Sequence, residues 1–121
     1  ESCVTSVKLR WINQNPFNSM FWAVQGMAAE LSTGALVMAQ IRAHGANVSM
    51  LVANNKATFT KKAKGRITFT CNDGVSIKEA ISATVANGEG QTCLMKAVGT
   101  DEANDIVSVF EFEWTVRRKN S

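Results

Sequence analysis

FNSMFWAVQGMAAELSTGALVMAQIRAH, residues 17–44, is the longest stretch of this chain without the alternation of a strand. It ends with Arg42 and His44 followed by Gly45, and cations in a last turn followed by glycine are a helix stop signal. Apolar residues recur along it at steps of three and four: Phe21, Val24, Met27, Ala28, Leu31, Ala35 and Met38. The remaining positions are also rich in alanine, leucine, valine and isoleucine, so we expect a helix that is buried on all sides.

Two glycines interrupt this helix, at Gly26 and Gly34. Each costs about 1 kcal/mol of helix propensity relative to alanine, so a packing reason is expected for both. We predict that another element lies very close to the helix backbone at these positions. A sheet curled around the helix would provide that contact.

Strand patterns surround the helix. Residues 4–11 alternate apolar and polar side chains with the period of a half-buried strand, and residues 47–62 and 66–72 are rich in β-favouring residues. A turn candidate, Lys64 followed by Gly65, separates the last two. We therefore predict that these two strands form a hairpin.

The second half of the chain predicts a short helix and two more strands. Ser76 and Glu79 form a capping-box pattern in front of an apolar-periodic stretch, and strands are expected at residues 92–98 and 106–116. This order of elements lacks the regular strand and helix alternation of a doubly wound fold, so the fold class is α+β, in a single domain over residues 1–121. An exposed edge of the antiparallel sheet favours pairing with a second copy, at least as a homodimer.

The composition excludes several classes of protein. A net charge of +3 is too small to indicate nucleic-acid binding, which remains a distant alternative, and no apolar run is long enough to span a membrane. Residues 1–10 lack the pattern of a secretion signal. Cys3, Cys71 and Cys93 are odd in number and far apart, which fits no metal site and favours reduced thiols in the cytoplasm.

Glu30 is the one acidic residue inside the long apolar helix. A carboxylate there is costly unless a partner or a water-filled cleft receives it. A structural hydrogen bond, to Ser32, Thr33 or a neighbouring strand, explains it as well as a functional role does. Both interpretations stay open from the residues alone.

Two stretches resemble a known family. NPFNSMFWAVQGMAAE, residues 15–30, is similar to the helix start of hot-dog thioesterases of the phenylacetyl-CoA and 4-hydroxybenzoyl-CoA types, where asparagine or glutamine precedes the helix, His-Gly-Gly or a similar sequence opens it and an acid follows. Counting back from Glu30 places residues 21–23 at the His-Gly-Gly position. NNKATFTKKAKG, residues 54–65, resembles a strand of this family with its glycine turn. The resemblance is closest to a largely uncharacterised thioesterase-like branch.

This resemblance implies a hot-dog fold, in which a curved antiparallel sheet wraps a long central helix, and hydrolysis of an acyl-CoA thioester by a homodimer or a dimer of dimers. Glu30 would be the nucleophile or general base, and the backbone amide of Trp22 would stabilise negative charge on the carbonyl oxygen. Asn15 would orient the water or the carbonyl, and Thr33 would hold the carboxylate. Coenzyme A would enter as part of the substrate, with no separate cofactor.

The chain also departs from this family. Trp22 stands where its members commonly have glycine, and the histidine is absent, so a non-catalytic protein that binds acyl-CoA or fatty acyl groups is the alternative function. A basic cluster either contacts the CoA phosphates or keeps a sheet edge soluble. It consists of Lys61, Lys62, Lys64 and Arg66. His44 is better explained by the helix dipole than as a base. The methionines would suit an adaptable acyl pocket but more often fill a core, so we assign them no role; they are Met20, Met27, Met38, Met50 and Met95.

Overall fold

The structure, a computed structural model, describes residues 2–8, 20 and 22–119. Two helices and five strands follow one another in this part of the chain: β1 (Cys3–Lys8), α1 (Trp22–His44), β2 (Val48–Phe59), β3 (Arg66–Cys71), α2 (Gly74–Asn87), β4 (Gln91–Thr100) and β5 (Ile106–Arg118). The expected order of elements is confirmed. Residues 17–19 and 21, at the start of the predicted long helix, lie outside the described residues.

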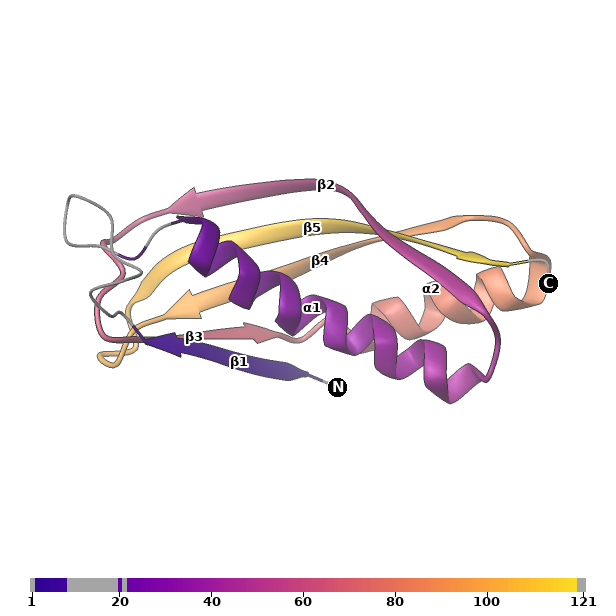
Figure 1. Ribbon diagram of the computed structural model, residues 1–121, viewed down its shortest axis with the longest axis horizontal. Coiled ribbons are helices and arrows are strands. Elements are labelled where there is room, and N and C mark those ends of the chain that lie inside the picture. Colours follow the sequence, from indigo (N-terminus) through magenta and orange to yellow (C-terminus); the bar gives the residue numbers. More distant parts are fainter. Residues whose placement is uncertain (1, 9–19, 21, 120–121) are drawn as a thin grey trace.

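The five strands form one antiparallel sheet in the order β1-β3-β4-β5-β2, and α1 runs along it (Figure 1). The predicted hairpin between β2 and β3 is wrong, because β2 pairs with β5 and β3 lies between β1 and β4. The 12 residues of β2 lie along the 13 residues of β5, whereas the 6 residues of β3 pair with β1 on one side and β4 on the other. Gly65 does make the predicted turn, with a φ of 71°, but the turn leads the chain across the end of the sheet.

One face of α1 packs on the sheet, and the two glycines mark the closest approach. A Cβ at Gly26 would lie 3.5 Å from a ring carbon of Phe110, and a Cβ at Gly34 would lie 3.4 Å from the indole of Trp114. The prediction that another element lies close to the backbone there is confirmed. Rings of β5 are these neighbours, and an added methyl group would meet them at about ordinary van der Waals contact distance.

The opposite face of α1 is exposed, so the prediction of a helix buried on all sides is wrong. Trp22, Met27 and Leu31 are 68%, 70% and 60% exposed, and Met38 is also exposed. A single curved sheet can cover only one side of a helix, and hydrophobic periodicity does not say which apolar positions it covers. This chain therefore presents an apolar helix face to its surroundings.

The second helix begins earlier than the capping-box pattern indicates. Its N-cap residue is Asp73, which makes no side-chain capping bond, and Ser76 and Glu79 lie inside the first turns of α2. The carboxylate of Asp73 instead accepts a hydrogen bond of 2.7 Å from the backbone N–H of Lys96 in β4. A tertiary contact has taken over the side chain that would otherwise cap the helix.

α2 is connected to the end of α1. The ring of His44 contacts the Gln40 carbonyl at 2.7 Å through Nδ1 and the hydroxyl of Ser82 in α2 at 2.8 Å through Nε2. Gly45 follows with a φ of 67° and donates its N–H to the Arg42 carbonyl. The predicted helix stop is confirmed, and His44 has a structural role at this point.

Candidate functional site

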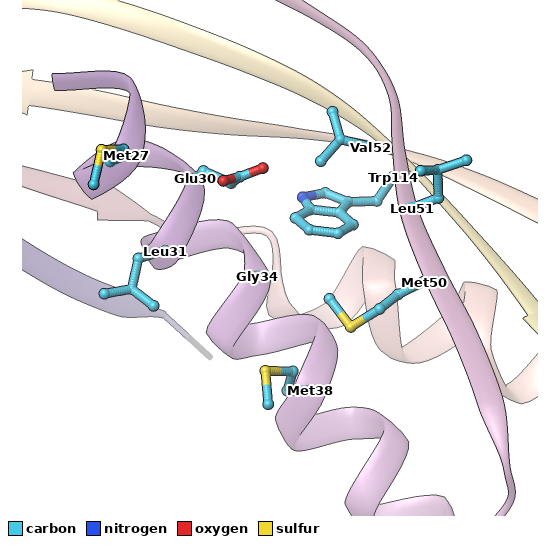
Figure 2. Close-up of a pocket in the computed structure, with 9 residues that line it drawn as sticks. All are labelled: Met27, Glu30, Leu31, Gly34, Met38, Met50, Leu51, Val52 and Trp114. Atoms are coloured by element: carbon cyan, nitrogen blue, oxygen red, sulfur yellow. The ribbon is translucent and has the colours of Figure 1, made fainter. Parts of the chain in front are cut away.

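A groove of about 760 Å³ lies between α1 and β2. The exposed helix face forms one wall, β2 forms the other, and an indole from β5 lies at its base (Figure 2). All lining residues except one glutamate are apolar. They are Met27, Glu30, Leu31, Gly34, Met38, Met50, Leu51, Val52 and Trp114.

Among the described residues that line the groove, Glu30 is the only ionisable one. Its carboxylate extends from α1 toward Val52 and Trp114 (Figure 2). The side chain is exposed and lines the groove, so the carboxylate opens into a cleft and is not enclosed by the core. A carboxylate in this place is hydrated, and an apolar molecule can reach it without displacing the core.

Thr33 is fully buried one turn beyond Glu30. Its hydroxyl donates to the backbone carbonyl of Glu30 at 2.9 Å and accepts the indole N–H of Trp114, also at 2.9 Å. A hydroxyl has a single proton to donate, so the expected bond from Thr33 to the Glu30 carboxylate is wrong. Thr33 holds the main chain of Glu30 instead.

Trp22 is the first residue of α1. The first amides of a helix have no partner within it, so the Trp22 N–H lies where a helix can bind negative charge. The indole is 68% exposed, which places it away from the core. Trp22 precedes Glu30 by eight residues, or about 12 Å along the helix axis. Asn15 lies outside the described residues.

The basic cluster lies where the chain passes from β2 to β3. The backbone N–H of Met20, just before α1, bonds to the Ala63 carbonyl at 3.0 Å, which places this segment beside the start of the helix. Lys62 and Lys64 are exposed there. Arg66 begins β3, and its guanidinium donates to the hydroxyl of Ser6 at 3.2 Å.

Lys61 differs from the rest of the cluster because its charge is neutralised. Its Nζ lies 2.7 Å from an oxygen of Asp101 and 2.8 Å from an oxygen of Asp105. The hydrogen bond to Asp101, followed by that to Asp105, raises the pKa of Lys61 to about 12. The same lysine is the main reason that the pKa of Asp101 lies below its usual value. This ion pair favours a structural role for Lys61 in joining two loops.

Sequence patterns missed most of the groove. Met27, Met38 and Met50 line it, although the sequence pattern assigned the methionines no role, whereas Met20 and Met95 are buried in the core. Their positions on an apolar helix and an edge strand do not distinguish a methionine that fills the core from one that lines a groove. Trp114 is the groove residue for which the sequence offers a signal. A glycine within a helix indicates that a large side chain packs against it, and a tryptophan ring is such a side chain.

Within residues 2–8, 20 and 22–119, no group of three histidine, cysteine, aspartate or glutamate side chains is arranged to hold a metal ion. No helix among these residues is long and apolar enough to cross a membrane.

Solved structures similar to this chain share its architecture. A Pseudomonas aeruginosa protein described as a probable thioesterase is 20% identical, with a TM-score of 0.83 over 98% of this chain and 77% of that one. A hypothetical thioesterase protein from Streptococcus pneumoniae is 16% identical, with a TM-score of 0.68 over 98% and 84%. A Bacillus halodurans protein solved with CoA is 11% identical, with a TM-score of 0.70 over 93% and 66%.

The sequence itself matches one family. No protein of curated function matches this chain. The profile of a family described as "Domain of unknown function (DUF4442)" matches residues 1–116. The long helix on a curved five-stranded antiparallel sheet is the hot-dog fold of the similar structures. The chain therefore belongs to the DUF4442 family and has the hot-dog fold.

Proposed function

We propose that this protein hydrolyses acyl-CoA thioesters and that Glu30 performs the reaction. The observation that carries the proposal is the carboxylate of Glu30 in a groove whose other lining residues are apolar. In one route a carboxylate oxygen attacks the thioester carbonyl and expels the CoA thiolate, which leaves an anhydride that water cleaves. In the other route the carboxylate takes a proton from the water molecule that attacks the carbonyl. Both routes end in a free acid and a free thiol.

The groove favours an aliphatic acyl group. Thioether and branched aliphatic side chains form most of its walls, and methionine adapts to flexible ligands. Structures of the same fold described as thioesterases, and one solved with CoA, support a CoA thioester as the substrate. In this proposal Lys62 and Lys64 contact the CoA phosphates, because Lys61 is already paired with two aspartates.

We further propose that two copies complete each site. Trp22 and Glu30 are eight residues apart on one helix, about 12 Å along its axis, and this separation disfavours their action on the same carbonyl within one chain. A second copy with its helix antiparallel to the first would bring its own Trp22 amide to the first copy's Glu30. β2 is at the edge of the described sheet and the apolar face of α1 lies beside it, so both surfaces favour such a homodimer.

Thiol release from a panel of acyl-CoAs tests the chemistry. Glu30→Gln removes the charge at nearly constant shape, and we expect at least a hundredfold loss of kcat, the usual scale for an acid or base group. Glu89→Gln, at an exposed position after α2, is the matched control and keeps the wild-type rate. Equal rates for wild type and Glu30→Gln exclude the proposed role. Retained acyl-CoA without turnover supports the binding alternative.

Complementation tests the shared site. Trp22→Pro removes the backbone N–H at a helix position that tolerates proline. Both Trp22→Pro and Glu30→Gln are expected to be inactive alone. After the two variants are unfolded together and refolded, half of the dimers are mixed and one of their two sites is intact, so about a quarter of the wild-type activity returns. No recovery in dimers shown to be mixed means that each site lies within one chain.

A further inference from the structure

We propose that Trp114 is a positioning residue for Glu30 and that it acts through Thr33. This inference rests on the proposed function, because it assigns a role to the groove in which Glu30 reacts. Trp114 belongs to β5 and Thr33 to α1, so the connection joins the sheet to the helix at the reacting residue.

Two hydrogen bonds in series make this connection. The indole N–H of Trp114 donates to Thr33 Oγ1 at 2.9 Å, and the Thr33 hydroxyl donates to the Glu30 carbonyl at 2.9 Å. Thr33 is 0% exposed and Trp114 is 6% exposed. In a buried setting such bonds are strong and a lost partner is costly, so the Glu30 peptide is held at a fixed distance from the sheet.

Packing adds a second constraint at the next turn of the helix. The indole lies against Gly34, where a Cβ would be 3.4 Å from the ring. Gly34 is four residues after Glu30 and therefore lies on the same helix face. The ring packs beside the helix backbone at Gly34, and rotation of the helix would break the bond between Thr33 and the indole. The ring therefore sets both the depth and the rotation of α1 where Glu30 enters the groove.

The choice of residues favours a positioning role over core filling. Valine has nearly the volume of threonine and would fill the site of Thr33 without a hydroxyl to desolvate. A hydroxyl bonded to a carbonyl one turn earlier does not strengthen a helix and often bends it. The same indole also lines the groove, so a bound acyl group touches the ring that holds Glu30 (Figure 2).

Three substitutions test this inference in the full-length protein. Thr33→Val removes the hydroxyl, Trp114→Phe removes the indole N–H, and Thr33→Ser keeps the hydroxyl. We expect Thr33→Val and Trp114→Phe each to lower kcat about tenfold, with KM within about twofold, because small misplacements of a reacting group act mainly on the transition state. The double variant is expected to be no slower than either single variant, because both substitutions break the same connection between Trp114 and Glu30. Thr33→Ser keeps the hydroxyl and is expected to retain the wild-type rate.

A control separates positioning from a general loss of stability. Ser108→Ala breaks another buried bond between sheet and helix, the 2.8 Å bond from the Ser108 hydroxyl to Gln25, and neither residue lines the groove. We expect it to lower the melting temperature about as much as Thr33→Val does while leaving kcat unchanged. Equal effects of Ser108→Ala and Thr33→Val on kcat overturn the inference.

A second readout does not depend on turnover. The carboxyl carbon-13 signal of Glu30, identified by its loss in Glu30→Gln, is expected to shift in Trp114→Phe and Thr33→Val, while the signal of Glu89 stays in place. An unshifted Glu30 signal overturns the positioning role. If the wild type cleaves no thioester, the proposed function fails, and this measurement still decides whether Trp114 positions Glu30.

Discussion

Under the proposed function, the groove predicts how hydrolysis depends on acyl chain length. Met27 and Met38 are the first and last residues of α1 that line it, and Glu30 lies eight residues before Met38, which corresponds to about 12 Å along the helix axis. An extended chain advances about 1.2 Å per bond, as in an extended backbone with three bonds per residue, so roughly ten carbons fill this length. With the thioester carbonyl at Glu30, a ten-carbon chain would end near Met38.

The magnitude follows from the burial of methylene groups. Each one that leaves water contributes about 0.8 kcal/mol, which is close to fourfold in affinity. We therefore expect kcat/KM to rise up to about fourfold per added carbon and to level off near ten carbons. Thiol release measured from butyryl-CoA to palmitoyl-CoA gives this profile.

Substitution at the end of the groove provides the matching test. Met38→Trp fills the far end and should move the plateau to shorter chains, whereas Met38→Ala should move it to longer ones. Leu94→Ala is the control, because Leu94 is also an exposed apolar residue but lies on β4, outside the groove. A profile that does not depend on chain length, or a plateau unmoved by both Met38 variants, refutes the assignment of this groove to the acyl chain.

Two further predictions concern stability. Gly99→Ala should lower the free energy of unfolding, measured by urea denaturation, by about 1–3 kcal/mol, because the added Cβ would lie 2.5 Å from a ring carbon of Phe69 and overpacking costs this much. Gly90→Ala is the control and should cost little, because no described atom lies within 4 Å of its added carbon. Equal effects of the two substitutions would contradict the packing argument. Burial raises the pKa of Cys71 from its ordinary value of 9.0 to about 11, so folding favours the neutral thiol. The contribution of this thiol to the stability of the folded state is therefore complete below pH 9 and is lost as the pH rises to about 11. The melting temperature of wild type relative to Cys71→Ala should therefore fall across that window, and a constant difference would show that the folded state does not disfavour the thiolate.

Local signals in the sequence predicted the elements well. The end of α1 at His44 and Gly45 depends on backbone groups within one turn, and such a signal is complete in the residues themselves. Gly26 and Gly34 also predicted a tertiary contact, because a residue that is costly in a helix indicates a close neighbour. It does not identify that neighbour. The structure supplies that identity as Phe110 and Trp114.

Signals that depend on distant partners failed. The capping box at Ser76 is a valid local pattern, but the helix begins at Gly74, and the carboxylate of Asp73 is taken by a strand that comes more than 20 residues later. The turn at Gly65 was correct while the strand pairing around it was not. Pairing depends on which strands have matching lengths and buried faces, and this is settled only when the whole sheet forms.

The site illustrates the same limit. Glu30 could be singled out because a charge in an apolar helix is costly, but Thr33 and Trp114 are 81 residues apart and no pattern connects them. The role assigned to Thr33 was wrong for a related reason. Sequence spacing placed its hydroxyl one turn from Glu30, whereas the bond goes to the carbonyl of that residue and not to its carboxylate.

The apolar character of α1 on every side has two separate causes in this structure. One face is apolar because it packs on the sheet, with Ala29 and Val37 fully buried, while Met27 and Leu31 on the other face remain exposed. Hydrophobic periodicity reports that a residue leaves water, but it does not distinguish burial within the chain from burial by a ligand or a second copy. Glu30 lies where these two faces meet, beside the groove. Contiguous exposed apolar surface is uncommon on a soluble monomer, so an apolar face beside this carboxylate favours a surface that a ligand or a second copy covers.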